Sequence, residues 1–379
     1  MPAIQTYNKI AKIGLDRFPE GYTCGDAVEN PAAAIVRSAS LLDTDFPASM
    51  LAIARAGAGY NNIPVDKCTA QGICVFNTPG ANANAVKELV ICSLLLASRK
   101  VAAALDWAKT LKGQGAEVGK LVEKGKAQFT GPEIAGKTLG LIGLGAIGGL
   151  VANAAVALGM SVFGYDPFLS DTAKAKLDTS VQIVPTVDEV LAVSDYVSLH
   201  LPLTPDTKGF INTRTLEAAK DGVRILNFSR DGLVKSADIL EGLASGKIAA
   251  YITDFPTDDL IGADGVTAIP HLGASTPESE DNCAVMAADQ IKAYLEWGAV
   301  RNSVNLPKTD DLPPSFGSRV CVIHKAGDDA AVLSALGGAP DFTVTGNRGE
   351  IGYTIADYCS APDTAAVASL PGVVRVRVI

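Results

Sequence analysis

The central part of the chain alternates short apolar runs with longer amphipathic stretches. Short apolar runs bounded by turn residues predict buried strands, and the stretches between them predict helices. The runs lie at residues 138–142, 160–165, 181–184, 195–199, 223–227, 249–253 and 266–269. Strands that alternate with helices pair in parallel, with helices on both faces of the sheet. The pattern therefore predicts a doubly wound parallel α/β sheet between residues 137 and 272.

The residues before this sheet predict a smaller α/β unit. Apolar runs at 32–36 and 51–54 predict strands, with Gly- and Asn-rich loops after them. A long helical pattern covers 86–111, and the Gly- and Lys-rich segment 112–126 is expected to be exposed.

The residues after the sheet predict a helix at 278–297, followed by a segment at 302–307 that we expect to return to the first unit. A polar, Pro-containing linker covers 308–317. Beyond it the pattern predicts strand, helix, hairpin, short helix and strand, at 319–324, 328–336, 342–345 with 352–356, 362–369 and 373–379. That order is βαββαβ, a ferredoxin-like unit.

A Gly-rich turn joins the first two strands of the central sheet, with the sequence Gly143-Leu-Gly145-Ala146-Ile147-Gly148. Gly143 permits a tight turn, Gly145 lets a pyrophosphate approach the backbone, and Gly148 lets helix and strand pack closely. The following helix presents free N–H groups to phosphates. The next strand ends at Asp166, whose carboxylate can accept from ribose hydroxyls and would repel a 2′-phosphate. The segment predicts an NAD site; a purely structural turn is the alternative.

Composition narrows the class of protein. The chain has 379 residues, 48% hydrophobic and 19% charged, which predicts more than one ordered domain. Its net charge of −9 argues against a nucleic-acid surface. Seven scattered cysteines, no signal-like N-terminus and no apolar stretch long enough for a membrane favour a cytoplasmic protein with reduced thiols. The three histidines have no metal-ligand spacing.

Polar segments follow the later strands of the same sheet. In such sheets ligands bind beyond the carboxyl ends of the strands. His271 suits proton transfer because imidazole titrates near neutral pH, and Arg230 can grip a carboxylate with its planar fork. The alternatives are a structural loop His and an Arg that forms a surface ion pair with Asp231 or Asp254. The segments contain His200 and Pro202, Ser229 and Arg230, Asp254, Asp258 and Asp259, and His271, Gly273 and Ala274.

Together these segments resemble the D-isomer-specific 2-hydroxyacid dehydrogenase family. The blocks that carry the resemblance are Val36-Arg37-Ser38, Arg55-Ala-Gly57, Asn77 to Asn82, the Gly-rich turn, Asn227 to Gly232 and Pro270 to Thr276. The likeness is greatest to members that oxidise D-3-phosphoglycerate to 3-phosphohydroxypyruvate with NAD, at the start of serine synthesis. It implies that His271 is the acid/base, that Arg230 holds the substrate carboxylate, and that His200, Pro202, Ser229, Asp254, Gly273 and Ala274 contact the cofactor.

The chain departs from the family at the carboxylate that partners the His. The family has Glu five residues after an Asp that contacts the nicotinamide; here that position is Asp259, with Asp258 as the alternative. Asp is one methylene shorter, so the pair requires a closer backbone. Both acids could instead belong to a solvated turn.

The resemblance also implies how substrate and effector bind. Backbone N–H groups around Gly57 and Ala58 would hold the carboxylate, and Arg37 and Arg55 the phosphate, with Ser38 and Asn82 lining the cleft. The C-terminal unit resembles an ACT regulatory module and could bind serine, but its loop at 324–329 keeps Gly327 and lacks the family's Asn. A dimerisation module is the alternative.

The expected architecture has three parts. A flavodoxin-like substrate domain is split into 1–95 and 283–307, a Rossmann NAD domain covers 96–282, and the ACT-like module covers 317–379. We expect a homodimer or homotetramer, because the helix at 86–111 resembles the family's dimer arm. Two alternative functions remain: a dehydrogenase of another D-2-hydroxy acid, of lactate, glyoxylate or 2-oxoglutarate type, or an NAD-sensing binding protein.

Overall fold

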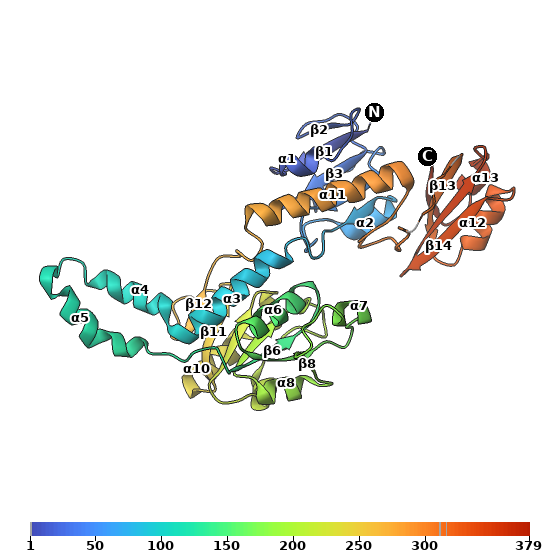
Figure 1. Ribbon diagram of the computed structural model, residues 1–379. Coiled ribbons are helices and arrows are strands. Elements are labelled where there is room, and N and C mark those ends of the chain that lie inside the picture. Colours follow the sequence, from blue (N-terminus) through green and yellow to red (C-terminus); the bar gives the residue numbers. More distant parts are fainter. Residues whose placement is uncertain (1, 311, 316) are drawn as a thin grey trace. The chain divides into compact units, whose positions relative to one another are not determined.

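A computed structural model describes residues 2–310, 312–315 and 317–379 (Figure 1). The chain divides into two compact units: unit 1 contains Met1–Asn82 and Thr276–Ile379, and unit 2 contains Ala83–Ser275. In the described part of the chain, no helix combines the length and apolar character that crossing a bilayer requires.

Unit 2 is built on one seven-stranded parallel sheet with the order β12-β11-β10-β9-β6-β7-β8. Its strands are β6 (Thr138–Ile142), β7 (Ser161–Tyr165), β8 (Gln182–Ile183), β9 (Tyr196–Leu199), β10 (Val223–Asn227), β11 (Ile248–Thr253) and β12 (Val266–Ala268). Its helices are α3 (Ala83–Arg99), α4 (Val101–Thr110), α5 (Val118–Gly125), α6 (Ala146–Ala157), α7 (Asp171–Lys174), α8 (Val187–Val193), α9 (Thr213–Glu217) and α10 (Ser236–Ser245), with 3-10 turns at Gly115–Glu117, Lys126–Phe129 and Asp231–Leu233.

Both faces of this sheet are buried, as the doubly wound prediction requires. Along β10, Leu226 packs into one apolar cluster with α3 and α6, and its neighbour Ile225 packs into a second cluster with α8, α9 and α10. In β11, Ile252 likewise packs into the first cluster and Tyr251 into the second. Burial on both faces explains why these strands are continuous apolar runs in the sequence.

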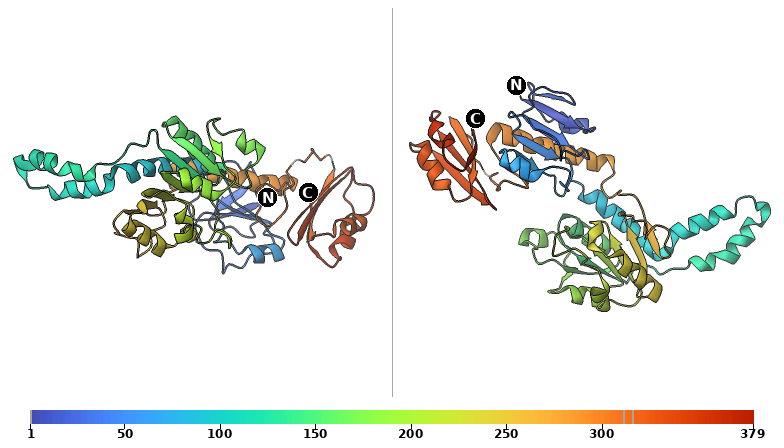
Figure 2. Two further views of the ribbon diagram at one scale, coloured as in Figure 1. Left: turned by 90° about the horizontal axis from the view of Figure 1, so that it is seen from below. Right: turned by 180° about the vertical axis from the view of Figure 1, so that it is seen from behind.

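The helical pattern at 86–111 forms two helices, α3 and α4, and not one. The chain breaks at Lys100, which has φ +49° in the left-handed region. The buried side of α3 packs on α6 through Val90 and Leu94. Because α3 packs on α6, it belongs to unit 2. The compact units divide at 82/83 and 275/276, whereas the sequence pattern suggested domain limits at 95/96 and 282/283. Beyond α3, the helices α4 and α5 project past the sheet of unit 2 (Figure 2).

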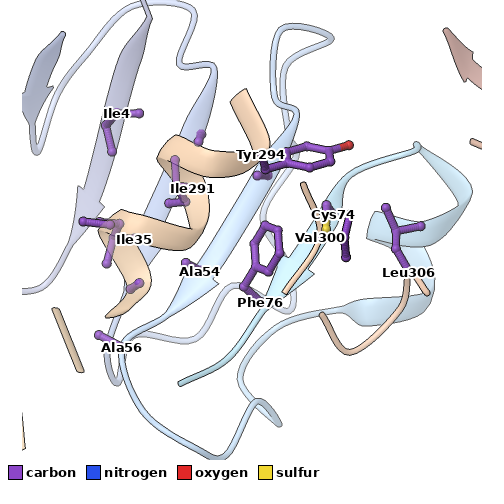
Figure 3. Close-up of a cluster of buried hydrophobic side chains, with 14 of the residues drawn as sticks. Ile4, Ile35, Ala54, Ala56, Cys74, Phe76, Ile291, Tyr294, Val300 and Leu306 are labelled. Atoms are coloured by element: carbon purple, nitrogen blue, oxygen red, sulfur yellow. The ribbon is translucent and has the colours of Figure 1, made fainter. Parts of the chain in front are cut away.

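Unit 1 contains a five-stranded parallel sheet with the order β2-β1-β3-β4-β5. Its elements are β1 (Ala3–Tyr7), α1 (Lys12–Leu15), β2 (Thr23–Gly25), β3 (Ala33–Val36), β4 (Ala52–Arg55), α2 (Val65–Ala70), β5 (Cys74–Phe76) and α11 (Pro277–Trp297). The long helix α11 packs on this sheet, with Ile291 beside Ile35 and Ala54 (Figure 3). The segment after α11 returns to β5 as expected, where the Val304 N–H donates to Val75 O at 2.8 Å.

The C-terminal part of unit 1 forms the predicted βαββαβ module. Its elements are β13 (Ser318–Lys325), α12 (Asp329–Leu336), β14 (Phe342–Arg348), β15 (Ile351–Tyr358), α13 (Ala365–Ala368) and β16 (Val373–Val378), in an antiparallel sheet of order β14-β15-β13-β16. One face of the sheet packs on α12 and α13. The opposite face, with Ile323 and Tyr353, joins the cluster that contains Phe76 and Tyr294.

Candidate functional site

The Gly-rich turn of unit 2 has the geometry of a dinucleotide cradle. Gly143 has φ +98°, and a Cβ there would lie 2.4 Å from His200 O. A Cβ on Gly148 would lie 2.1 Å from Gly143 O, so this position also excludes larger residues. A Cβ on Gly145, in contrast, would meet no described atom within 4 Å. Open space therefore lies over Gly145 at the start of α6, whose first turn carries no side-chain cap.

Asp166, at the end of β7, is tied to the same turn. Its Oδ2 accepts the N–H of Leu144 at 2.8 Å, and its Oδ1 accepts the N–H of Phe168 at 2.9 Å. These bonds fix the carboxylate beside the turn and leave each oxygen with further capacity to accept a hydroxyl. A ribose placed there would find the acceptor that the sequence predicts.

His200 follows β9 and lies against the turn. Its Nε2 is 3.0 Å from Ser198 Oγ, while its buried Nδ1 has no hydrogen-bond partner among the described residues. Burial lowers the pKa of His200 from the ordinary 6.5 to about 4, so the imidazole is neutral at physiological pH. A neutral ring with one unpaired nitrogen can contact a cofactor but is a poor proton carrier near pH 7.

The remaining predicted groups of unit 2 follow the ends of β10, β11 and β12. Ser229 donates to Leu199 O at 2.6 Å, and Arg230 Nη1 donates to Ser229 O at 2.6 Å. Asp254 is 1% exposed, and its Oδ2 accepts the N–H of Gly273 at 3.0 Å. The exposed His271 ring lies 4.8 Å from the ring of Phe255. The sheet therefore presents the turn, Asp166, His200, Arg230, Asp254 and His271 at the carboxyl ends of six of its strands.

The structure does not join His271 to the acids that the sequence assigned to it. Asp259 is exposed and accepts a hydrogen bond from the Thr257 hydroxyl. Across the described ranges, no hydrogen bond or ion pair links His271 to Asp258 or Asp259. The pairing stays a prediction.

Unit 1 brings two predicted anion-binding residues together. Arg55 ends β4, and its Nε donates to the backbone O of Arg37, which follows β3, at 3.1 Å. The Arg55 side chain folds over Gly57, where a Cβ would lie 1.2 Å from Arg55 Nη1. Arg37 pairs with Glu280 of α11 at 2.7 Å. Glycine is favoured at position 57 by its positive φ of +153°, and the Arg55 guanidinium occupies the space beside it.

The loop after β4 keeps two donors available. The N–H groups of Ala56 and Gly57 bond to Val36 O and Arg55 O, whereas those of Ala58 and Gly59 have no bond to the described residues. Free adjacent N–H groups suit a carboxylate. Asn82, at the end of this part of unit 1, has a buried Oδ1 without a partner among the described residues.

Sequence reasoning missed several residues that shape these sites. Asn8, with φ +71°, accepts the N–H groups of Ser38 and Ala39 and so fixes the loop that follows Arg37. Glu280 and Phe255 were also missed. Their partners lie far away in the sequence or in another loop, so no local spacing pointed to them.

In the C-terminal module, an amide from β14 contacts the loop at 324–329. Asn347 of β14 accepts the Gly327 N–H at 3.3 Å and donates to Asp329 at 3.4 Å. His324 is fully buried, with Nε2 2.8 Å from Thr354 Oγ1 and Nδ1 2.8 Å from Lys325 O.

Comparison with known proteins places the chain in a family. The NAD-binding domain of the D-isomer specific 2-hydroxyacid dehydrogenases matches residues 91–273. Hydroxypyruvate reductase of Thermotoga maritima is 38% identical over 269 residues, which is 68% of this chain and 82% of that protein. The chain belongs to the D-isomer specific 2-hydroxyacid dehydrogenase family. D-3-phosphoglycerate dehydrogenase of Mycobacterium tuberculosis is 36% identical over 289 residues, 74% of this chain and 52% of that protein. The chain thus matches about half the length of this relative.

Solved structures agree with this family. NAD+-bound 3-phosphoglycerate dehydrogenase of Entamoeba histolytica matches with a TM-score of 0.62 and 26% identity, over 80% of this chain and 98% of that one. A glyoxylate reductase from Paecilomyes thermophila matches with a TM-score of 0.66 and 25% identity, over 80% and 98%. The cofactor of the family domain is NAD, and the open space at Gly145, the fixed Asp166 and the unpaired His200 Nδ1 fit a dinucleotide.

Proposed function

We propose that this protein oxidises D-3-phosphoglycerate to 3-phosphohydroxypyruvate with NAD, the first step of the phosphorylated route to serine. Two observations support the proposal: the 36% identity to the mycobacterial phosphoglycerate dehydrogenase, and the juxtaposition of Arg37 and Arg55 at the ends of neighbouring strands. The position of the two Arg residues carries more weight. Two guanidinium groups suit a phosphate, whereas a 2-hydroxy acid with a small uncharged substituent does not need them.

In this reaction His271 takes the proton of the substrate hydroxyl and becomes an imidazolium. Bound NAD supplies the acceptor for the hydride that leaves the same carbon. Arg230 holds the carboxylate and polarises the oxygen that becomes the carbonyl. A nearby carboxylate would stabilise the imidazolium, and Asp259, or Asp258 beside it, is the acid that the family pattern suggests.

We assign the substrate's phosphate to Arg37 and Arg55. The N–H groups of Ala58 and Gly59, which have no bond to the described residues, are the donors that unit 1 offers to the carboxylate. Ser38 and Asn82 complete the substrate contacts. The cofactor contacts are proposed as Gly143, Gly145, Ala146, Ile147, Gly148, Asp166, His200, Pro202, Ser229, Asp254, Gly273 and Ala274.

The experiment compares kcat/KM for NADH-dependent reduction of 3-phosphohydroxypyruvate and of unphosphorylated hydroxypyruvate. We expect Arg37→Ala and Arg55→Ala to lower kcat/KM for the phosphorylated substrate at least about tenfold and to leave the other nearly unchanged, since each loses a charged hydrogen bond to phosphate. Arg17→Ala is the matched control, because Arg17 also forms an ion pair with α11, to Asp289 at 2.9 Å. Equal losses on both substrates, or a loss in the control, would contradict the assignment.

A second candidate is reduction of hydroxypyruvate or glyoxylate without a phosphate. The Thermotoga hydroxypyruvate reductase favours it, because this chain covers 82% of that protein. Higher kcat/KM for unphosphorylated substrates in the same experiment would select this candidate. An NAD-sensing binding protein would bind NADH and turn over none of these ketoacids.

We propose that the protein is a cytoplasmic homodimer or homotetramer. Exposed apolar residues on α4 and α5, among them Leu105, which is 60% exposed, support contact with a second copy. We also propose that the ACT-like module binds an amino acid such as serine near Gly327, where Asn347 supplies an amide. Light scattering during size-exclusion chromatography, and calorimetric titration with serine, test these two proposals.

A further inference from the structure

In unit 1, the guanidinium of Arg37 is bound to an acid of the same unit. Arg37 Nη2 lies 2.7 Å from Glu280 Oε1, and the two side chains are 37% and 41% exposed. An Arg makes a charge-assisted contact of this kind with a phosphate oxygen as well as with a carboxylate. Glu280 therefore uses a donor that the phosphate of a substrate would need.

The position of Glu280 is fixed by the start of α11. Thr276 Oγ1 accepts the Ser279 N–H at 3.1 Å and caps the helix. Ser279 is buried, and Cys283, one turn further on, packs into the apolar cluster that contains Ile35 of β3 (Figure 3). The first turn of α11 is thus held on the sheet of unit 1, from where Glu280 reaches the loop after β3.

Arg37 is held equally well on its side of the pair. Its backbone O accepts Arg55 Nε at 3.1 Å, and Asn8 Oδ1 accepts the N–H of the next residue, Ser38, at 2.9 Å. Two guanidinium side chains therefore start from neighbouring strand ends, where their like charges repel. The negative charge of Glu280 offsets this repulsion when no anion is bound. A phosphate group carries more charge, about −1.5 to −2, and three acceptor oxygens.

The contact with Arg37 is particular to Glu280 among the nearby acids of α11. Glu278 lies in the same first turn but is exposed and forms no ion pair with the described residues. Asp289, further along the helix, pairs with Arg17 at 2.9 Å. These two acids carry the same charge on the same helix without contacting Arg37, so they provide matched controls.

We propose that Glu280 is an internal competitor for Arg37 and thereby sets how strongly the protein prefers phosphorylated substrates. Phosphate binds Arg37 when it displaces the Glu280 carboxylate. An unphosphorylated substrate makes no contact with Arg37, so Glu280 does not affect its binding. The inference rests on the proposed function, which assigns the substrate's phosphate to Arg37. Glu280 is a specificity-determining residue and takes no part in the proton transfer.

The test is a calorimetric titration of the cofactor-free protein with inorganic phosphate. Each protein is compared with its Arg37→Ala counterpart, so phosphate bound elsewhere, such as at the Gly-rich turn of unit 2, does not count. We expect Glu280→Gln to tighten the Arg37-dependent binding about threefold to fivefold, the range set by the strength of a half-exposed ion pair. Glu280→Ala, which has no amide to bond to Arg37, should show the same gain.

The controls remove one negative charge from α11 without releasing Arg37. Glu278→Gln and Asp289→Asn should each change the phosphate affinity by less than about 1.5-fold, because solvent screens their charges. An unchanged or weaker affinity in Glu280→Gln would overturn the proposal, since Glu280 would then only hold Arg37 in place. An equal gain in Glu278→Gln or in the Arg37→Ala background, or no Arg37-dependent binding in any variant, would also overturn it.

Kinetics separate this inference from the proposed function. With an active enzyme, Glu280→Gln should lower KM for 3-phosphohydroxypyruvate and leave KM for hydroxypyruvate unchanged. A protein that shows the expected phosphate binding but reduces no ketoacid would refute the proposed function alone. Rapid, phosphate-selective reduction together with an unchanged phosphate affinity in Glu280→Gln would refute the role of Glu280 alone.

Discussion

His200 is a partly buried histidine, with its Nδ1 atom fully buried, whose effect on stability can be measured. Its pKa in the folded protein is about 4, below the ordinary 6.5. Between these values the unfolded chain binds more protons than the folded one, so stability is full above pH 6.5 and falls as the pH approaches 4. Burial of an imidazole in the neutral state is the physical cause.

We therefore expect the free energy of unfolding to fall by up to about 3 kcal/mol from this residue between pH 7 and 4. His200→Gln should remove that part of the decline, and His271→Gln, at an exposed position, should not. Urea unfolding at several pH values measures the free energy of unfolding of each variant. The same pH dependence in wild type and His200→Gln would show that burial of His200 has no such effect.

At the scale of elements, two glycines at the start of α6 have different roles: Gly145 leaves space for a ligand, and Gly148 allows close packing. Gly145 faces open space, whereas a Cβ on Gly148 would meet the backbone at Gly143 O, 2.1 Å away. The two glycines are three residues apart in one turn, so they form a matched pair.

We expect Gly145→Ala to lower the free energy of unfolding by less than about 1 kcal/mol, the cost of a poorer helix cap. Its affinity for NADH should fall at least about tenfold, because the methyl group occupies the space for the pyrophosphate. Gly148→Ala should cost about 1–3 kcal/mol of stability through overpacking. Chemical unfolding and NADH fluorescence titration measure both effects. Unchanged NADH affinity in Gly145→Ala would contradict the cradle.

The sequence predicted elements well where turn residues bound a continuous apolar run. β6, β9 and β10 lie within a residue of their predicted limits. β1 was missed because one of its two buried positions is the polar Thr6, so that no apolar run marks it, and β5 because it has three residues. The break at Lys100 has no Gly or Pro to announce it. Residues such as Asp166 were accessible through a local motif, whereas the links of Arg37 to Glu280 and of Asp254 to Gly273 depend on the tertiary fold.

Within unit 1, the C-terminal module is joined to the rest through buried groups. Arg319 is 2% exposed and forms two 2.7 Å hydrogen bonds with Asp357, while it also donates to Trp297 O and Pro313 O. Arg375 donates to Met50 O at 2.8 Å, and Arg377 to Tyr294 O at 2.8 Å. These bonds indicate that the module and α11 unfold together.

Asp357→Asn should lower the free energy of unfolding by about 3–5 kcal/mol, because it leaves a buried guanidinium without its counter-charge. Asp289→Asn breaks the exposed pair with Arg17 and should cost less than about 1 kcal/mol. The chain has two tryptophans, so in a Trp107→Phe background Trp297 reports on unit 1. A loss below about 1 kcal/mol in Asp357→Asn would argue against the buried pair as a structural link.

For the molecule as a whole, we expect a dehydrogenase that is selective for a phosphorylated substrate. The most direct test follows NADH absorbance with purified wild-type protein and 3-phosphohydroxypyruvate, hydroxypyruvate, glyoxylate or pyruvate. We expect rapid oxidation with the phosphorylated ketoacid and kcat/KM at least about tenfold lower with the others, the discrimination that one charged phosphate contact provides. Equal or greater activity with an unphosphorylated ketoacid, or none with any while NADH still binds, would contradict the claim.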